Sequence, residues 1–431
     1  MIMYDKKTLA AEIRGGALNS RIEEVYGCAA PQTEVYAERL AKVTEGFLST
    51  FPENGQARVG LYSAPGRTEI GGNHTDHQCG CVLAASVNLD AVAAAAPNGT
   101  KVIRFFSEGY GMIEVDLTDT EPVESEKEST ASLIRGMAAQ AKARGFAVSG
   151  FDAYCTSSVL GGSGLSSSAA FETLTGVILN DFYCENSFDA VEIAKMGQKA
   201  ENIWFGKPSG LMDQSASSVG GVVAIDFADV EKPVVEKIDL NLAKEGYALC
   251  IVDSRSSHAD LTDAYAGIPV EMKSVAALFG QEHLRGLTVQ QLMGRTAEIR
   301  EKCGDRAFLR AMHFVLDNER AQQEAQALRD GDFDRFLAIV NESGHSSYEY
   351  LQNTCVEGAV KNQAVNVALS LCDVLLGGRG AHRVHGGGFA GTVQAFVPLD
   401  LLETFRSSID AAIGEGSCHV LSIRPIGGAI L

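Results

Sequence analysis

Four segments of this chain gather glycines, serines and charged side chains in patterns suited to ligand binding or catalysis. The sharpest is 157–171, SSVLGGSGLSSSAAF, where a predicted strand enters a Gly/Ser loop that leads directly into a helix. Small residues let the backbone approach a ligand, and a helix N-terminus offers unpaired N–H groups and a positive dipole end. A serine in the first turn can also join the ligand shell of Mg²⁺. The segment is therefore a candidate phosphate site.

Two familiar nucleotide motifs do not fit this segment. A P-loop has Lys-Ser/Thr after its glycines, which is missing here, and Ser166 stands where the dinucleotide fingerprint has its last glycine. A Gly/Ser turn that only caps the helix is the alternative, and this segment alone leaves it open.

The second segment, 64–77 with sequence APGRTEIGGNHTDH, begins at a predicted Pro65-Gly66 turn and crowds polar side chains onto a predicted loop. Its mixture of donors and acceptors suits a polyhydroxylated ligand. A metal site at His74 and His77 with Asp76 lacks a third well-placed ligand. A solvated loop is the remaining alternative. The polar residues are Arg67, Glu69, Asn73, His74, Thr75, Asp76 and His77.

The third and fourth segments are weaker signals taken singly. In 201–214, ENIWFGKPSGLMDQ, Glu201 ends a predicted helix and Asp213 closely follows Gly210. A carboxylate beside such a turn can orient a substrate hydroxyl, and Glu201 can bind Mg²⁺. In 384–392, VHGGGFAGT, small residues surround Phe389. This segment either covers a ligand or is a tight connection between elements.

Strands and helices alternate around these segments, which indicates an α/β or α+β fold. An Asn98-Gly99 turn predicts a hairpin between the second strand and the third. The polar stretch 228–237 is the predicted domain boundary. The predicted strands are 58–63, 81–96, 102–106, 151–157, 221–227, 247–253 and 392–397. The predicted helices are 34–47, 132–144, one directly after the serines, 188–204, 259–278, 289–303, 305–330, 332–343, 356–371 and 399–413.

Bulk composition excludes several classes of protein. The 431 residues carry a formal net charge of −19, so non-specific binding to nucleic acid or to an anionic membrane is not expected. Ten scattered cysteines indicate free thiols in a reducing compartment. The chain has no apolar run of about 18 residues and no evident signal peptide, so we expect a cytoplasmic protein.

Taken together and in this order, the four segments resemble the motifs of galactokinases in the GHMP kinase family. Residues 64–76 are similar to the signature that opens with A-P-G-R and closes with H-T-D, and 164–169 match the phosphate loop G-L-S-S-S-A. Residues 210–214 match G-[IL]-M-D-Q, and 386–391 match the third motif, G-G-G-F-x-G. The similarity runs from about residue 58 to 398.

The resemblance implies an α+β, two-domain GHMP kinase fold. Residues 1–228 would form a domain like ribosomal protein S5 domain 2, residues 229–431 a ferredoxin-like domain, and ATP would lie between them. The implied activity is that of an ATP-dependent sugar 1-kinase, with galactose as the first expectation. The alternatives are a kinase for another aldose, such as N-acetylgalactosamine or arabinose, and a non-catalytic sugar sensor on the same fold.

The resemblance also implies roles for individual residues. Asp213 would be the catalytic carboxylate, kept ionised by Arg67, which would stabilise the transferring phosphoryl group. Ser168 and Glu201 would hold Mg²⁺. The residues expected to wrap the ATP phosphates are Gly162, Ser163, Gly164, Leu165, Ser166, Ser167 and Ser168. Those expected to contact the sugar are Asn73, His74, Thr75, Asp76, Gly210 and Tyr265.

Two departures from the family pattern fall beside the expected sugar pocket. Asn73 stands where galactokinases usually have glutamate, and Glu69 stands where asparagine is usual. Both departures bear on the identity of the sugar more than on the chemistry of phosphoryl transfer.

Overall fold

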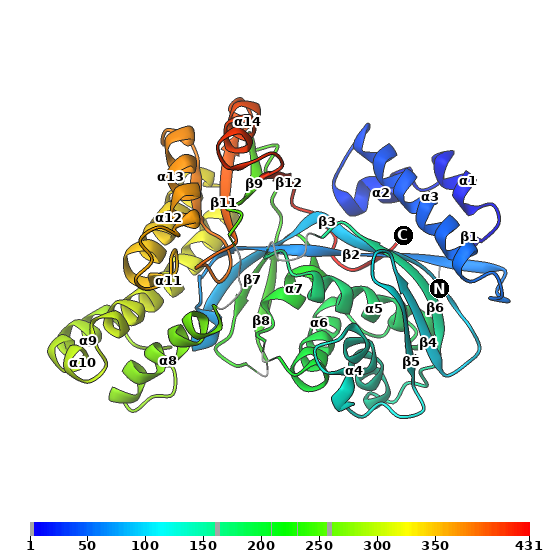
Figure 1. Ribbon diagram of the computed structural model, residues 1–431, viewed down its shortest axis with the longest axis horizontal. Helices are drawn as coiled ribbons and strands as arrows, with labels where there is room; N and C mark the ends of the chain where they lie inside the picture. The colour runs from blue at the N-terminus through cyan, green and yellow to red at the C-terminus, as the bar shows by residue number, and fades with distance from the viewer. Residues whose placement is uncertain (1–3, 160–163, 208, 231, 257–260) are drawn as a thin grey trace.

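The computed structural model describes residues 4–159, 164–207, 209–230, 232–256 and 261–431 of the chain (Figure 1). Strands of the larger sheet run in the order β1-β2-β3-β6-β4-β5, with β13 and β7 joining β2 and β3 and β8 joining β7. These strands are β1 (Tyr4–Asp5), β2 (Arg58–Gly71), β3 (Cys81–Pro97), β4 (Val102–Ser107), β5 (Gly111–Asp116), β6 (Phe151–Ser157), β7 (Val222–Asp226), β8 (Val234–Ile238) and β13 (Ala429–Ile430).

Helices cover this sheet on both faces (Figure 1). One face carries α4 (Thr130–Ala143), α5 (Ser167–Tyr183), α6 (Ala190–Lys199) and α7 (Met212–Val219). The other carries α1 (Leu9–Arg14), α2 (Asn19–Tyr26) and α3 (Gln32–Thr50). Single-turn 3₁₀ segments lie at Asp76–Gln78 and Glu124–Glu126, and a π-helical turn, Ala200–Phe205, follows α6.

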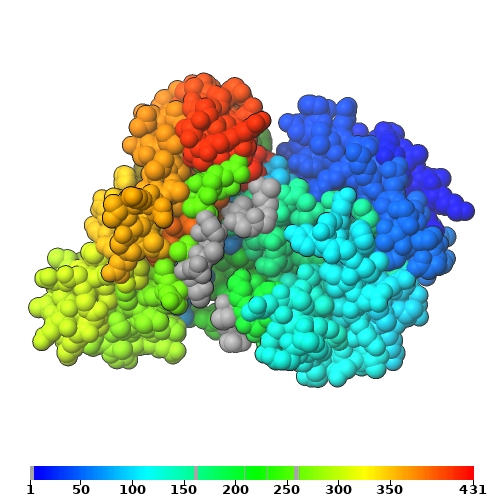
Figure 2. All heavy atoms as spheres, viewed as in Figure 1, coloured from blue at the N-terminus to red at the C-terminus, as the bar shows by residue number. Residues whose placement is uncertain are grey.

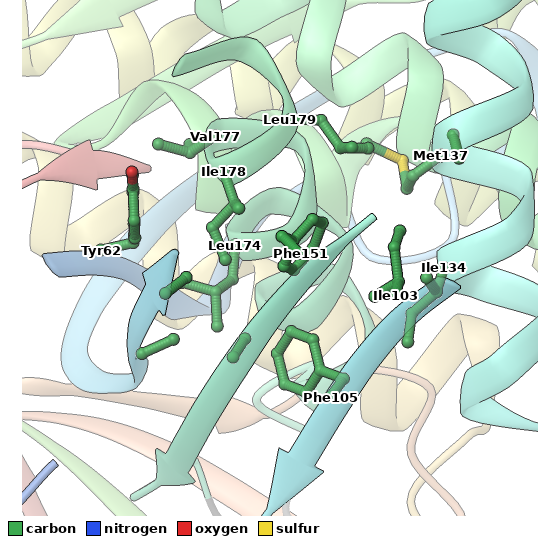
Figure 3. Close-up of a cluster of buried hydrophobic side chains, with 14 of the residues drawn as sticks. Tyr62, Ile103, Phe105, Ile134, Met137, Phe151, Leu174, Val177, Ile178 and Leu179 are labelled. Atoms are coloured by element: carbon green, nitrogen blue, oxygen red, sulfur yellow. The ribbon is translucent and has the colours of Figure 1, made fainter. Parts of the chain in front are cut away.

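The sequence of β3 explains this three-layer arrangement. Successive strand side chains point to opposite faces, so a strand buried on both sides reads as one continuous apolar run. Ala93 and Ala95 accordingly pack with α4 and α5, whereas Val92 and Ala94 pack with α1–α3. The small alanines let both helical layers come close to the sheet. Figure 3 shows the first of these cores, where Phe151 of β6 lies among side chains of β4, α4 and α5.

The second half of the chain forms a four-stranded antiparallel sheet and a helical lobe. The sheet order is β10-β11-β9-β12. Its strands are β9 (Tyr247–Asp253), β10 (Ala381–Val384), β11 (Thr392–Pro398) and β12 (Cys418–Leu421), and the helices α12 (Phe333–Ser346), α13 (Ala364–Leu376) and α14 (Leu402–Ile413) pack around it. The lobe contains α8 (Thr262–Leu278), α9 (Val289–Gly294), α10 (Thr296–Lys302) and α11 (Asp305–Asp330), and a π-helical turn, Ser347–Leu351, extends α12.

The long helix α11 joins the two halves, because it packs against β2 and β3 as well as against α8 and α12. Figure 2 shows a recess between the halves, with green segments of the chain on its floor. No helix in the described part of the chain is both long enough and apolar enough to cross a bilayer.

The structure corrects one predicted turn and one predicted strand pairing. No chain reversal occurs at Pro65-Gly66: β2 continues through it, and the pairing with β3 merely shifts register between Pro65 and Arg67. The polar residues Arg67 and Glu69 therefore lie on a strand and not on a loop. The Asn98-Gly99 turn forms, but β3 and β4 are not paired, because β6 lies between them in the sheet. Local turn chemistry cannot reveal a strand inserted from later in the chain.

Other boundaries differ in smaller ways. The predicted helix 289–303 is divided into α9 and α10, and the predicted helix 356–371 begins later, at Ala364. The polar stretch 228–237 contains most of β8, which pairs with β7, so the larger sheet continues past residue 228. The division into domains at residues 228 and 229 stays a prediction.

A buried ion-pair cluster fastens α3 and the C-terminal segment to β3. Asp90 of β3 is fully buried and accepts hydrogen bonds from the guanidinium groups of Arg39 and Arg424. Burial alone raises the pKa of Asp90, but the two arginines outweigh it and lower that pKa. Asp90 therefore stabilises the fold above its unfolded pKa of about 3.9, and that stabilisation is lost as the pH falls through the lower, folded pKa.

We expect Asp90→Asn to lower the free energy of unfolding by about 3–5 kcal/mol, because the fully buried Arg424 and the partly buried Arg39 lose their charge partner. The matched control is Glu24→Gln, which removes an exposed carboxylate paired with Arg21 and should cost less than about 0.5 kcal/mol. Urea unfolding at pH 7 measures both. Equal shifts in the two variants would contradict the assigned role of Asp90.

Candidate active site

A bidentate ion pair stands at the junction of the elements described above. Arg67, on β2 just after the register shift, donates from Nε to Asp213 Oδ1 at 2.7 Å and from Nη2 to Oδ2 at 2.7 Å. Asp213 lies in the first turn of α7. Burial alone raises the pKa of Asp213, but Arg67 and the Ser166 hydroxyl outweigh it, and the net pKa is below the usual range. The predicted pairing is thus found, and Asp213 is ionised at neutral pH.

The same arginine holds the described end of the phosphate loop. Its Nη1 donates to the carbonyl oxygen of Gly164, and its backbone N–H donates to Leu165 O at 2.9 Å. Ser166, with a left-handed φ of 56°, donates from Oγ to Asp213 Oδ2 at 2.7 Å. A Cβ at Gly66 would stand 2.8 Å from Leu165 O, so this approach requires glycine. Loop and ion pair are therefore one unit.

Of the other residues predicted to contact phosphate, two are placed by the structure and two lie outside its described part. Ser167 opens α5 and Ser168 follows it, at the helix N-terminus that the sequence predicts. Gly162 and Ser163 lie outside the described residues, so their predicted phosphate contacts stay predictions.

Ser168 and Glu201, the two residues expected to hold Mg²⁺, lie close to each other. Ser168 Oγ lies 3.4 Å from Glu201 Oε1, and the ammonium of Lys207 lies 3.1 Å from the same oxygen. A cation thus already contacts this carboxylate. Mg²⁺ in phosphoryl-transfer sites commonly takes one or two protein carboxylates and completes its shell with phosphates and water. The described residues contain no cluster of three or more His, Cys, Asp or Glu. A hydroxyl and one carboxylate therefore suit Mg²⁺ that arrives with a nucleotide.

Two of the expected sugar contacts lie against the glycine loop of the fourth segment. His74 donates from Nε2 to Gly387 O at 2.9 Å, and Tyr265 donates from its hydroxyl to Gly388 O at 2.8 Å. Burial, together with His77, lowers the pKa of His74 to about 4, so its imidazole is neutral at pH 7. Tyr265 also packs edge-to-face on Phe389, with ring centroids 5.3 Å apart. The fourth segment is thus part of the site.

Asp76 and Gly210 meet beside the ion pair. A Cβ built on Gly210 would stand 2.9 Å from Asp76 Oδ2, so the carboxylate lies directly against the backbone of the segment that leads to Asp213. Its side chain keeps 17% of its surface exposed, and its negative charge helps to raise the pKa of Arg67. Asp76 can therefore accept a hydrogen bond from a ligand close to Asp213.

Asn73 is not presented to a ligand. It is fully buried, and its amide is saturated: Nδ2 donates to Glu69 Oε1 at 2.9 Å and to Gly386 O at 2.8 Å. Its Oδ1 accepts from Ser347 Oγ at 3.2 Å and from Asn353 Nδ2 at 2.8 Å. With every hydrogen-bonding position used, Asn73 joins β2 to the glycine loop from below the site.

Thr75 is likewise fully buried, and its hydroxyl is directed at backbone oxygens of Gly72 and Cys81. The structure therefore places Asn73 and Thr75 behind His74 and Asp76, where they support the site. We carry neither forward as a sugar contact.

Several residues of the site were missed or set aside in reading the sequence. Arg383 is fully buried and donates to Glu69 Oε1 at 2.7 Å, and His385 bonds Thr68 and Thr392. Burial, with the Arg67 charge, lowers the pKa of His385 to about 3. Both residues are close in sequence to the glycines of the fourth segment. That position is the feature of the sequence that could have indicated their place in the site. The hydrogen bonds of the His385 ring are to threonine hydroxyls.

The comparisons with known proteins agree with this geometry. Residues 132–221 match the family model for the GHMP kinases N terminal domain, and residues 45–97 match the galactokinase galactose-binding signature. The chain is 30% identical to a galactokinase of Actinobacillus pleuropneumoniae over 358 residues, covering 80% of this chain and 87% of that protein. It is 29% identical to a galactokinase of Streptomyces coelicolor over 378 residues, covering 86% and 93%.

Solved structures show the same fold. Lactococcus lactis galactokinase complexed with galactose superimposes with a TM-score of 0.77 at 25% identity, covering 91% of this chain and all of that one. A mevalonate kinase superimposes with a TM-score of 0.58 at 13% identity, which bears on the fold alone. The predicted α+β GHMP kinase fold is thus confirmed. The 30% identity that extends over most of both chains settles the family: this protein belongs to the galactokinases, within the GHMP kinases.

Proposed function

We propose that this protein is an ATP-dependent sugar 1-kinase that transfers the γ-phosphoryl group of ATP to the anomeric hydroxyl of galactose. The observation that carries the proposal is the bidentate pair between Arg67 and Asp213, held against the phosphate loop by Gly164 and Ser166. Membership of the galactokinase family and the likeness to a galactokinase complexed with galactose support the choice of sugar.

The two charged groups divide the work of the reaction. The transition state of phosphoryl transfer is loose, so positioning and charge stabilisation matter more than covalent assistance from the protein. Ionised Asp213 accepts the hydrogen bond of the anomeric hydroxyl and aims its oxygen at the γ-phosphorus. Arg67 places its positive charge beside the γ-phosphoryl group and stabilises the negative charge of that group during the transfer. The new bond joins sugar oxygen to γ-phosphorus as the bond to the β–γ bridging oxygen breaks and ADP leaves.

Asp213 is better suited to orient the hydroxyl than to remove its proton. The ion pair lowers its pKa, and a carboxylate with a low pKa is a weak base. The hydroxyl proton therefore leaves late: as the oxygen loses electron density to phosphorus the hydroxyl becomes more acidic, and only then does the proton pass to the Asp213 carboxylate.

The remaining roles follow from position. The helix N-terminus at Ser167 and Ser168 faces the phosphates, and Ser168 with Glu201 would hold Mg²⁺. When bound, Mg²⁺ supplies charge neutralisation at the phosphate oxygens. His74, Asp76, Gly210 and Tyr265 are the proposed contacts of the sugar.

One observation favours a second candidate substrate class. Glu69 and Asn73 exchange the residue types that galactokinases usually carry at these two positions, and here the Glu69 carboxylate is drawn inward to Arg383. The layer behind the proposed sugar contacts consequently has a buried amide where a carboxylate is usual. N-acetylgalactosamine and arabinose are therefore the alternative acceptors. A non-catalytic sugar sensor is disfavoured because Arg67, Ser168, Glu201 and Asp213 are all present.

The first experiment is coupled ADP release with galactose, N-acetylgalactosamine and arabinose, followed by phosphorus and proton NMR of the products. We expect the largest kcat/KM with galactose and a phosphate on the anomeric oxygen. No sugar-stimulated ADP release with any of the three would overturn the proposed function. A phosphate on another hydroxyl would overturn the assignment as a 1-kinase.

Replacing Asp213 tests its role directly. We expect Asp213→Ala to lower kcat by about 10²–10⁴-fold, because the hydroxyl loses the acceptor that orients it. Binding of ADP, measured by calorimetry, should change by less than about threefold. The matched control is Asp334→Ala on the exposed surface of α12, which should leave both quantities unchanged. Turnover near wild type in Asp213→Ala would contradict the assignment.

Glu69 and Asn73 are expected to be energetically coupled, since they are hydrogen-bonded to each other and Glu69 also pairs with Arg383. Asn73→Glu alone places a second carboxylate against Glu69 and should raise the KM for sugar and lower the melting temperature. Adding Glu69→Asn restores one carboxylate and one amide, and we expect it to recover about 1–3 kcal/mol of the loss. A double-mutant cycle of thermal unfolding and sugar KM measures this coupling. Strictly additive effects would show that the two side chains act independently.

A further inference from the structure

The amide of Gln214 joins two buried carboxyl groups next to the reaction centre. Gln214 directly follows Asp213 on α7 and is fully buried. Its Nε2 donates to Glu201 Oε2 at 2.9 Å and to Glu172 Oε2 at 3.0 Å. An amide nitrogen carries two hydrogens, so both of its donors are used. The side chain therefore has one defined orientation.

This small cluster connects the elements that carry the proposed metal ligands. Glu172 lies on α5 four residues after Ser168, so both point from the same face of that helix. Glu201 lies in the π-helical turn after α6, and Gln214 lies on α7. A Cβ on Gly197 would stand 2.8 Å from Glu172 Oε2 and 3.1 Å from Gln214 Cγ, so α6 leaves just enough room for the cluster.

The bond to Gln214 leaves one oxygen of Glu201 available. Oε2 is occupied by the amide, whereas Oε1 faces the Ser168 hydroxyl at 3.4 Å and the Lys207 ammonium at 3.1 Å. Mg²⁺ requires a compact octahedral shell, in which a carboxylate contributes a single oxygen, whereas Ca²⁺ readily accepts both. Mutation of a residue that hydrogen-bonds to a metal-binding side chain, without touching the metal itself, commonly lowers metal affinity by about 10- to 100-fold.

We propose that Gln214, held by Glu172, is a positioning residue that fixes Glu201 as a one-oxygen metal ligand and so sets the affinity for the divalent ion that accompanies the nucleotide. This inference rests on the proposed function for the presence of that ion.

Packing alone does not account for the cluster. Glu172 Oε1 and Gln214 Oε1 are both buried without a hydrogen-bond partner in the described part of the chain. Each such atom costs about 1–3 kcal/mol. A cluster that served only stability would be replaced at no loss by apolar side chains of the same size. The presence of a carboxyl and an amide at this buried place, in contact with Glu201, therefore points to a role in positioning Glu201.

The experiment measures metal binding separately from catalysis. The dissociation constant of Mn²⁺ from the complex of the full-length protein with ADP is determined by electron paramagnetic resonance, and the affinity for metal-free ADP is determined by calorimetry. For Gln214→Met, which keeps the size of the side chain and removes both donors, we expect Mn²⁺ to bind about 10–100-fold more weakly. Metal-free ADP affinity and sugar KM should stay within about twofold, and added Ca²⁺ should compete for the site more effectively.

Two further variants and one control complete the set. Glu172→Met removes the acceptor that holds the amide and should weaken Mn²⁺ binding in the same direction, which also keeps the test valid if Gln214→Met does not fold. Glu172→Gln keeps an acceptor oxygen and should recover the wild-type Mn²⁺ affinity to within about threefold. The matched control, Gln322→Met on the exposed surface of α11, should change nothing.

The outcomes separate this inference from the proposed function. Unchanged Mn²⁺ affinity in Gln214→Met and Glu172→Met, or an equal loss of metal-bound and metal-free ADP binding, would overturn the positioning role. Wild-type protein that binds ADP no more tightly with Mn²⁺ than without it would overturn the role as well. Wild-type protein that binds Mn²⁺ with ADP but phosphorylates no sugar would overturn only the proposed function.

Discussion

The ion pair between Arg67 and Asp213 is the constraint around which the rest of this molecule is arranged. Two ions taken out of water are stable only if their geometry is good and their other hydrogen-bonding groups are satisfied. Arg67 meets that condition by donating to Asp213 with two nitrogens and to Gly164 with the third. These hydrogen bonds fix strand β2, the Gly/Ser loop and helix α7 to one another. Reactive groups held in this way lose little entropy when a substrate binds.

A second polar network lies beneath the sugar-facing residues and joins the two halves of the protein. Arg383 of β10 reaches Glu69 of β2, and Asn73 continues the network to the glycine loop and to α11, whose Asp317 accepts from the Asn73 backbone N–H. Because every atom of the Asn73 amide is used, a change here alters several elements together. The proposed sugar contacts are thus supported by residues that are themselves buried.

The two networks differ in which part of the proposed reaction they affect. The pair of Arg67 and Asp213 holds the two proposed catalytic groups, whose work would be the same for any acceptor sugar. The network of Glu69, Asn73 and Arg383 fixes the surroundings of His74 and Tyr265 through Gly386–Gly388. Substitutions in the second network can therefore change the acceptor without disturbing phosphoryl transfer. The exchange of residue types at Glu69 and Asn73 falls entirely within it.

Sequence alone determined the Gly/Ser loop that precedes α5 and the long elements β6, β9 and α11, because these depend on local patterns: small residues before a helix, apolar periodicity and capping signals. The pairing of Arg67 with Asp213 and the closeness of Ser168 to Glu201 were implied by the resemblance to the galactokinases and by no local pattern. Only the tertiary structure decided that β2 continues through Pro65-Gly66, that β6 separates β3 from β4, and that Asn73 and Thr75 are buried behind the site. Pairing partners and burial depend on segments far away in the chain, and no local pattern around Asn73 specifies that Ser347, Asn353 and Gly386 will use its amide.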